Sequence, residues 1–245
     1  MKFKKTSFWK AKELIWKSKK KSFYILCLDA LFLSVMFLLS RIISPDPYQI
    51  YSIEPSIILV FIALYFAFLL FFYSLTKYIV LLVIKSMHEK AEFTLKNYFR
   101  FALLNIIIAA IMLVIFFAFS LIAGLAVKQE NLALISTILL VAISIIFYFY
   151  ANIAHLLFII DNKIGKTIKQ AFEILFKRGK VYSPIILNML VFAVVYTLLG
   201  VALALIAGAE NLFSHRQIFT AAAGVLFYLV IFFNRVNLFC KIKNI

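Results

Sequence analysis

Long apolar runs alternate with short charged segments along the whole chain. A helix that crosses the hydrocarbon core of a membrane needs about 20 predominantly apolar residues, and most of the runs reach or exceed that length. The pattern predicts an all-α fold, a polytopic transmembrane helix bundle whose six spans pair as three hairpins. We place the spans at residues 23–40, 57–84, 101–126, 133–160, 184–207 and 217–240.

The segments between these runs are too short to bury a hydrophobic core of their own. We therefore treat residues 1–245 as a single integral membrane domain. It begins with a basic segment, which we expect to be retained with the first helix because no small-residue cleavage signal follows it. The segments are residues 1–22, followed by hairpin units at about 23–84, 85–160 and 161–240.

The basic N-terminal segment has a helical pattern of its own. Phe8, Ala11, Ile15 and Trp16 share one face of a helix over residues 8–20, with Trp9 beside Trp16. Indole rings favour the head-group level of a bilayer, so the pattern predicts a helix lying in the cytoplasmic interface. The alternative is a disordered basic tail that only sets topology.

A second amphipathic helix is predicted at residues 164–178, with Asp161 as its N-cap. Its polar side carries Lys166, Lys169 and Lys177, which would face lipid phosphates. The alternative is that this helix packs on a cytoplasmic partner. The predicted apolar face consists of Ile164, Ile168, Ala171, Phe172, Leu175 and Phe176.

Composition supports a membrane protein: 65% of the residues are hydrophobic and the mean hydropathy is +1.05. The net charge is +16, and most lysines and arginines fall in segments on one side of the predicted spans. By the positive-inside rule both termini are cytoplasmic and the protein is multi-pass in the plasma membrane. The positive charge thus indicates the bilayer and its anionic head groups as partners, not nucleic acid. A membrane-protein partner or a second copy of the chain stays open.

Polar residues recur inside the predicted spans. Asp29, Asn105 and Asn188 lie in the first helix of each hairpin, at intervals of about 80 residues. A second position recurs in the following helices as Lys77, His155 and Arg235. This spacing predicts a threefold repeat of helical hairpins, although chance similarity among apolar helices is the alternative.

These positions lie at a similar depth, in the inner third of the bundle, together with Asn152, Asn234 and Asn237. A lone charge there is costly, so we expect Asp29 to pair with Lys77. Two interpretations of this polar layer are open. It is either a set of interhelical hydrogen bonds that holds the helices together, or the lining of a cavity that binds an anion, a lipid head group or a proton.

Enzyme motifs are absent from the sequence, and His155 has no second His, Cys or carboxylate at helical spacing that would complete a metal site. We expect no cofactor and no metal. The favoured function is a non-enzymatic, envelope- or lipid-associated role. The alternative is a small-solute or lipid transporter that uses the polar layer.

Short basic amphipathic segments that lead into paired apolar helices, as at residues 166–177, give the chain a resemblance to YciC-like membrane proteins. It is also similar to the membrane domain attached to some glycerophosphodiester phosphodiesterases. Both likenesses imply a six-helix integral membrane protein and supply no catalytic residues. The three hairpins also resemble the layout of mitochondrial carriers, but the carrier signature is missing from the first helix of each hairpin.

Overall fold

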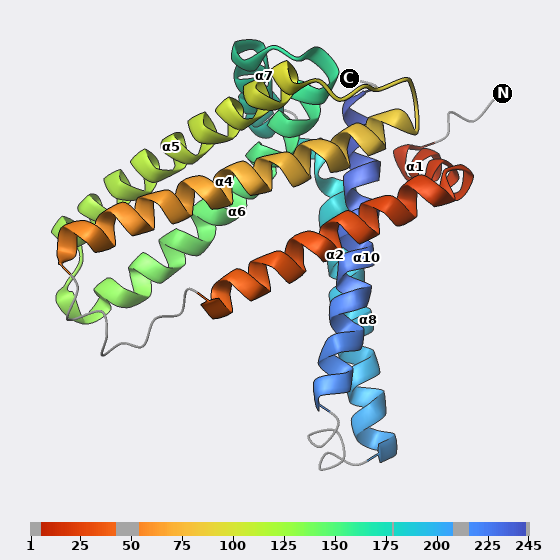
Figure 1. The fold of residues 1–245 in the computed structure, drawn as a ribbon. Coiled ribbons are helices and arrows are strands. Elements are labelled where there is room, and N and C mark those ends of the chain that lie inside the picture. Colours follow the sequence, from red (N-terminus) through yellow and green to blue (C-terminus); the bar gives the residue numbers. More distant parts are fainter. Residues whose placement is uncertain (1–5, 43–53, 178, 208–215, 244–245) are drawn as a thin grey trace. The chain divides into compact units, whose positions relative to one another are not determined.

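The computed structural model describes residues 6–42, 54–177, 179–207 and 216–243. These residues form eight α-helices and one short 3-10 helix, without a strand, which confirms the all-α prediction for the described part of the chain (Figure 1). The helices are α1 (Ser7–Lys17), α2 (Lys19–Ile42), α4 (Pro55–Ser86), α5 (Leu95–Ala126), α6 (Gln129–Asp161), α7 (Ile164–Lys177), α8 (Ser183–Ala207) and α10 (Arg216–Ile242), with the 3-10 helix η1 (Gly179–Val181) before α8.

Each of the six apolar ranges predicted from the sequence lies inside one of these helices. Among the described residues, five helical stretches are long and apolar enough to cross a membrane. Helix α8 has 25 residues, and its described apolar stretch, Ile185–Leu198, is shorter than the other five. The five long stretches are Lys19–Leu39, Ser56–Ser86, Leu95–Ala126, Gln129–Asp161 and Gly224–Ile242.

The chain divides into two compact units. The central unit comprises Lys20–Phe176, and in it α4, α5 and α6 each pack against the other two (Figure 1). Phe32 of α2 stacks on Phe72 of α4, with ring centroids 5.6 Å apart. The Lys85 ammonium group donates to the Ile159 carbonyl at 2.8 Å, near the C-terminal end of α6, where free carbonyls favour a positive charge.

The terminal unit comprises Met1–Lys19 and Lys177–Ile245. Helix α10 packs against both α1 and α8. Ala11 of α1 is fully buried, and the Phe8 ring lies 5.0 Å from the Phe233 ring of α10. The sequence predicted one domain and did not separate these units, because packing of α1 against α10 joins opposite ends of the chain.

Helix α1 ends at Lys17, earlier than the predicted residue 20, and α2 begins at Lys19. The predicted N-terminal helix is therefore present in a shortened form. The proline-rich outer segment at residues 43–53 and the turn at residues 208–215 lie outside the described residues.

Candidate functional site

The six predicted polar positions differ in burial. Asp29, Lys77, Asn105 and His155 are buried, each at 9% exposure or less, whereas Asn188 and Arg235 are half-buried. The first four belong to the central unit and the last two to the terminal unit. The structure thus contains two polar sites, which are described separately.

In the central unit, Asn105 of α5 connects α4 and α6. Its amide nitrogen donates to the Ser74 hydroxyl at 2.8 Å, and its amide oxygen lies 2.5 Å from Nε2 of His155. Because that oxygen can only accept, the Nε2 nitrogen of His155 donates in this contact. Positions 105 and 155, which the sequence placed at a similar depth in one hairpin, are joined by this hydrogen bond.

The His155 ring lies among aromatic side chains and is 1% exposed. Its centroid is 4.9 Å from that of Phe101 and 6.3 Å from that of Tyr73. Its second nitrogen, Nδ1, has no hydrogen-bond partner among the described residues. The side chain is held by one polar contact and by its packing, which is typical of a structural bundle residue.

Lys77 lies one helical turn after Ser74 on α4. Its ammonium group donates to the Asn152 side-chain oxygen at 3.1 Å, and the Asn152 amide donates to the Tyr148 carbonyl at 2.8 Å. The predicted pairing of Lys77 with Asp29 stays a prediction. We call Ser74, Lys77, Asn105, Asn152 and His155 the central polar cluster.

Ser74 was missed by the sequence reasoning. Its hydroxyl donates to the Leu70 carbonyl of its own helix at 2.6 Å. Such a contact satisfies a serine hydroxyl within an apolar helix without a partner on another helix. Its accepting lone pair faces Asn105, and no pattern along the sequence distinguishes it from other serines in spans. Its spacing of three residues before Lys77 is the one signal that could have suggested a shared face.

In the terminal unit the polar contact joins Asn188 of α8 to Asn234 of α10. The Asn188 amide nitrogen donates to the Asn234 side-chain oxygen at 2.7 Å. The sequence assigned Asn188 and Arg235 to the two polar positions of the third hairpin, and Arg235 lies one residue further along α10 than Asn234. The Asn234 amide nitrogen and the Asn237 amide oxygen are buried and have no partner among the described residues.

The predicted lipid-interface residues of α1 lie on its exposed side. Trp9 is 55% exposed and Trp16 is 70% exposed. The Lys12 ammonium group lies 5.1 Å from the Trp9 ring centroid, and that of Lys19 lies 4.2 Å from the Trp16 ring centroid. These are cation–π contacts that place a positive charge beside each indole.

Helix α7 begins at Ile164, so Asp161 does not cap it; Asp161 is the last residue of α6, and its carboxylate accepts from Lys166 at 2.6 Å. A face of α7 that the sequence did not predict packs on the protein. Thr167, Ala171 and Ile174 are the buried residues of α7.

The predicted apolar residues Phe172 and Phe176 are exposed, with ring centroids 4.5 Å apart. Lys169 and Lys177 are exposed as well. One face of helix α7 therefore packs on the central unit. Its other faces expose aromatic rings and lysines.

The chemistry of the two sites is that of hydrogen bonding, with the buried Lys77 ammonium group and the buried Asp29 carboxylate both in the central unit. Among the described residues, no group of three or more His, Cys, Asp or Glu side chains could hold a metal ion. The central polar cluster can hold helices together or offer a positive charge to an anion. Comparison of the chain with protein-family models, curated proteins and solved structures gave no match.

Proposed function

We propose that the protein is a six-span integral protein of the plasma membrane with a non-enzymatic, lipid-associated role in the cell envelope. Both termini face the cytoplasm in this proposal, and α8 is the sixth span. Its 25 residues correspond to about 37 Å of helix, longer than the roughly 30 Å hydrocarbon core.

The spans form three hairpins in this proposal: α2 with α4, α5 with α6, and α8 with α10. Two interhelical hydrogen bonds support it, Asn105 with His155 and Asn188 with Asn234. Each joins the two helices of one proposed hairpin at a corresponding place. The first hairpin has its two polar residues, Asp29 and Lys77, buried in the same unit.

One observation carries the lipid-associated role: the exposed face of α1, where each tryptophan lies beside a lysine. Ala11 faces the protein, so the indoles of Trp9 and Trp16 are left to face the surroundings. Indoles rest at head-group level, and each lysine near an anionic membrane surface contributes about 1 kcal/mol. The face is suited to hold α1 against anionic phospholipid.

The chain contains two tryptophans, both in α1, so its tryptophan fluorescence reports on this helix alone. The test is quenching of the full-length protein in vesicles that contain brominated phospholipid. We expect bromines near the head group to quench more than bromines deep in the acyl chain. Brominated phosphatidylglycerol should also quench more than an equal fraction of brominated phosphatidylcholine.

Lys12→Gln with Lys19→Gln should reduce the preference for brominated phosphatidylglycerol. Lys96→Gln, an exposed lysine of α5, is the matched control and should leave the preference unchanged. Equal quenching by the two lipids in the unsubstituted protein, or stronger quenching by deep bromines, would overturn the proposed role of α1.

A second candidate function is transport, and the buried Lys77 favours it. An ammonium group that is 9% exposed inside a predicted span is costly to keep and is often functional in membrane proteins. The Lys77 ammonium group donates to the side-chain oxygen of Asn152, which is half-buried. The arrangement would suit an anionic solute that approaches the ammonium group.

Asp29→Asn and Lys77→Met separate transport from a structural pair. Equal loss of folded protein in the two variants, with recovery when they are combined, supports a structural pair. Normal abundance with loss of phosphate or proton flux in proteoliposomes supports transport. Abundance is measured by size-exclusion chromatography of detergent extracts.

A further inference from the structure

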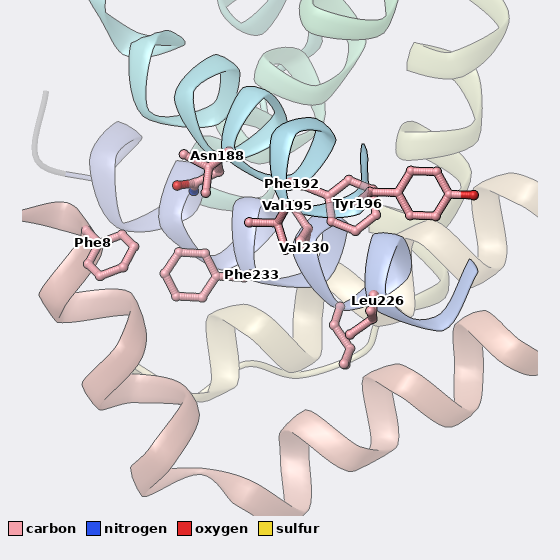
Figure 2. Close-up of a pocket in the computed structure, with 10 residues that line it drawn as sticks. Phe8, Asn188, Phe192, Val195, Tyr196, Leu226, Val230 and Phe233 are labelled. Atoms are coloured by element: carbon pink, nitrogen blue, oxygen red, sulfur yellow. The ribbon is translucent and has the colours of Figure 1, made fainter. Parts of the chain in front are cut away.

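The terminal unit contains an apolar groove between α8 and α10, with a volume of about 440 Å³ (Figure 2). Its α8 wall includes Val191, Val195 and Tyr196, and its α10 wall includes Leu226, Val230 and Phe233. The spacings are those of single helical faces, so two apolar faces are directed toward one space. The volume lies within the roughly 300–1,000 Å³ of small-molecule sites.

Large aromatic side chains explain why the two helices leave this space between them. Phe192 of α8 contacts Phe227 of α10, with ring centroids 5.5 Å apart, and stacks on Tyr196 at 6.1 Å. Helices in membranes approach closely where small residues meet. Here bulky rings meet, and Val191 and Val195 beside them remain about half exposed.

One end of the groove is polar and is bordered by α1. Phe8 and Asn188 both line the groove, and Phe8 packs on Phe233. The Asn188 amide nitrogen carries two hydrogens, and its contact with Asn234 uses one of them. The Asn234 amide nitrogen is buried, 5% exposed, and unpartnered among the described residues. The second hydrogen of the Asn188 amide is thus a hydrogen-bond donor beside a hydrocarbon-lined space.

The helix that borders this end, α1, is basic. Helix α1, which supplies Phe8, also carries Lys10, Lys12 and Lys17. With three lysines and one carboxylate, that of Glu13, the residues of α1 carry a net positive charge. An occupant with an apolar chain and a negatively charged head would match both the groove and its border.

We propose that the groove holds one acyl chain of an anionic phospholipid, with an ester carbonyl at the Asn188 amide and the phosphate near the α1 lysines. This inference rests on the proposed membrane role and deepens it, because it assigns a place to one particular lipid. The occupant differs from ordinary boundary lipid in two respects: walls of two helices flank its chain, and α1 contacts its head.

The test uses the full chain in vesicles doped with phosphatidylglycerol that carries a photoactivatable acyl chain. Crosslinks are mapped by mass spectrometry to peptides of α8 and α10. Val195→Trp fills the groove and should abolish the crosslinks to its α10 wall. Val194→Trp is the matched control, since Val194 is exposed on the same helix but does not line the groove, and it should retain them.

The head group is tested with matched photoactivatable probes, phosphatidylcholine and a free fatty acid. Phosphatidylglycerol should label the groove best, and replacing Lys10 and Lys12 with glutamine should weaken its labelling roughly fivefold per lysine. Equal labelling by the free fatty acid would overturn the phospholipid assignment. Equal labelling of the Val194→Trp and Val195→Trp variants would overturn the groove itself.

Failure of the groove can be told apart from failure of the proposed function. Tryptophan quenching by anionic lipid reports on α1 whether or not the groove is filled. Crosslinking to the α10 wall that Val195→Trp leaves unchanged, together with an anionic preference in quenching of the unsubstituted protein, would refute the groove assignment and leave the membrane role standing. If brominated phosphatidylglycerol and phosphatidylcholine quench the unsubstituted protein equally, both the groove assignment and the proposed role of α1 lose their basis.

Discussion

The central and terminal units each place an asparagine of one helix against a polar side chain of the next, but the two contacts differ in their surroundings. Asn105 is 4% exposed and joins Ser74 and His155 on two other helices. Asn188 is half-buried, makes its contact with Asn234 alone, and borders an open groove. The difference arises because three helices enclose Asn105, whereas Asn188 lies between two.

The comparison teaches that the number of enclosing helices decides what a polar residue in a span can do. In the central unit a third helix satisfies the amide and closes the site around it. In the terminal unit the same kind of contact leaves one Asn188 amide hydrogen available beside apolar walls. We therefore expect stability to depend on the first site and ligand binding to depend on the second.

The largest effect is expected from aromatic packing around the central polar cluster. Phe101 is fully buried and contacts the rings of His155, Tyr78 and Phe158. Phe101→Ala should lower the free energy of unfolding by about 3–5 kcal/mol, because the vacated space is walled on all sides. Phe192→Ala beside the open groove should cost clearly less. Thermal unfolding in detergent compares the two, and equal losses would contradict the distinction between a closed and an open site.

A smaller effect is expected from the asparagines themselves. Asn105→Leu leaves the buried His155 ring without its hydrogen-bond partner and should cost about 1–3 kcal/mol. Asn188→Leu should cost about 0.6 kcal/mol, near the average for a hydrogen bond between membrane helices. The matched check combines Asn105→Leu with His155→Leu, which should recover part of the loss because neither buried group is then left unpaired. A larger loss for Asn188→Leu would reverse the proposed order of the two sites.

The helical ranges could be predicted because each apolar run is bounded by charged residues or prolines. The buried face of α7 could not be predicted. Thr167 is buried while Phe172 and Phe176 are exposed, and in a protein surrounded by lipid an apolar side chain need not face the protein. The division into two units also escaped the sequence, because it depends on contact between residues near the two ends of the chain.

The candidate site was predicted in part. Residue counting along antiparallel helices fixes depth to about one turn, which placed Asn105 and His155 at a similar depth; their hydrogen bond comes from the structure. The same precision cannot separate neighbouring residues, so Asn188 was matched to Arg235 when its hydrogen-bond partner is Asn234. No pattern in the sequence indicated the groove, because its walls consist of the same residue types as any lipid-facing surface.

The central claim, a protein whose interfacial helices and termini lie on the cytoplasmic side, is tested most directly by cysteine labelling. Cys27 and Cys240 are the chain's two cysteines and are first replaced by alanine. Single cysteines are then introduced as Lys169→Cys on α7 and Gln129→Cys at the start of α6, two exposed positions. A membrane-impermeant maleimide should label Gln129→Cys in intact cells and Lys169→Cys only after the membrane is opened. Labelling of Lys169→Cys in intact cells would contradict the account.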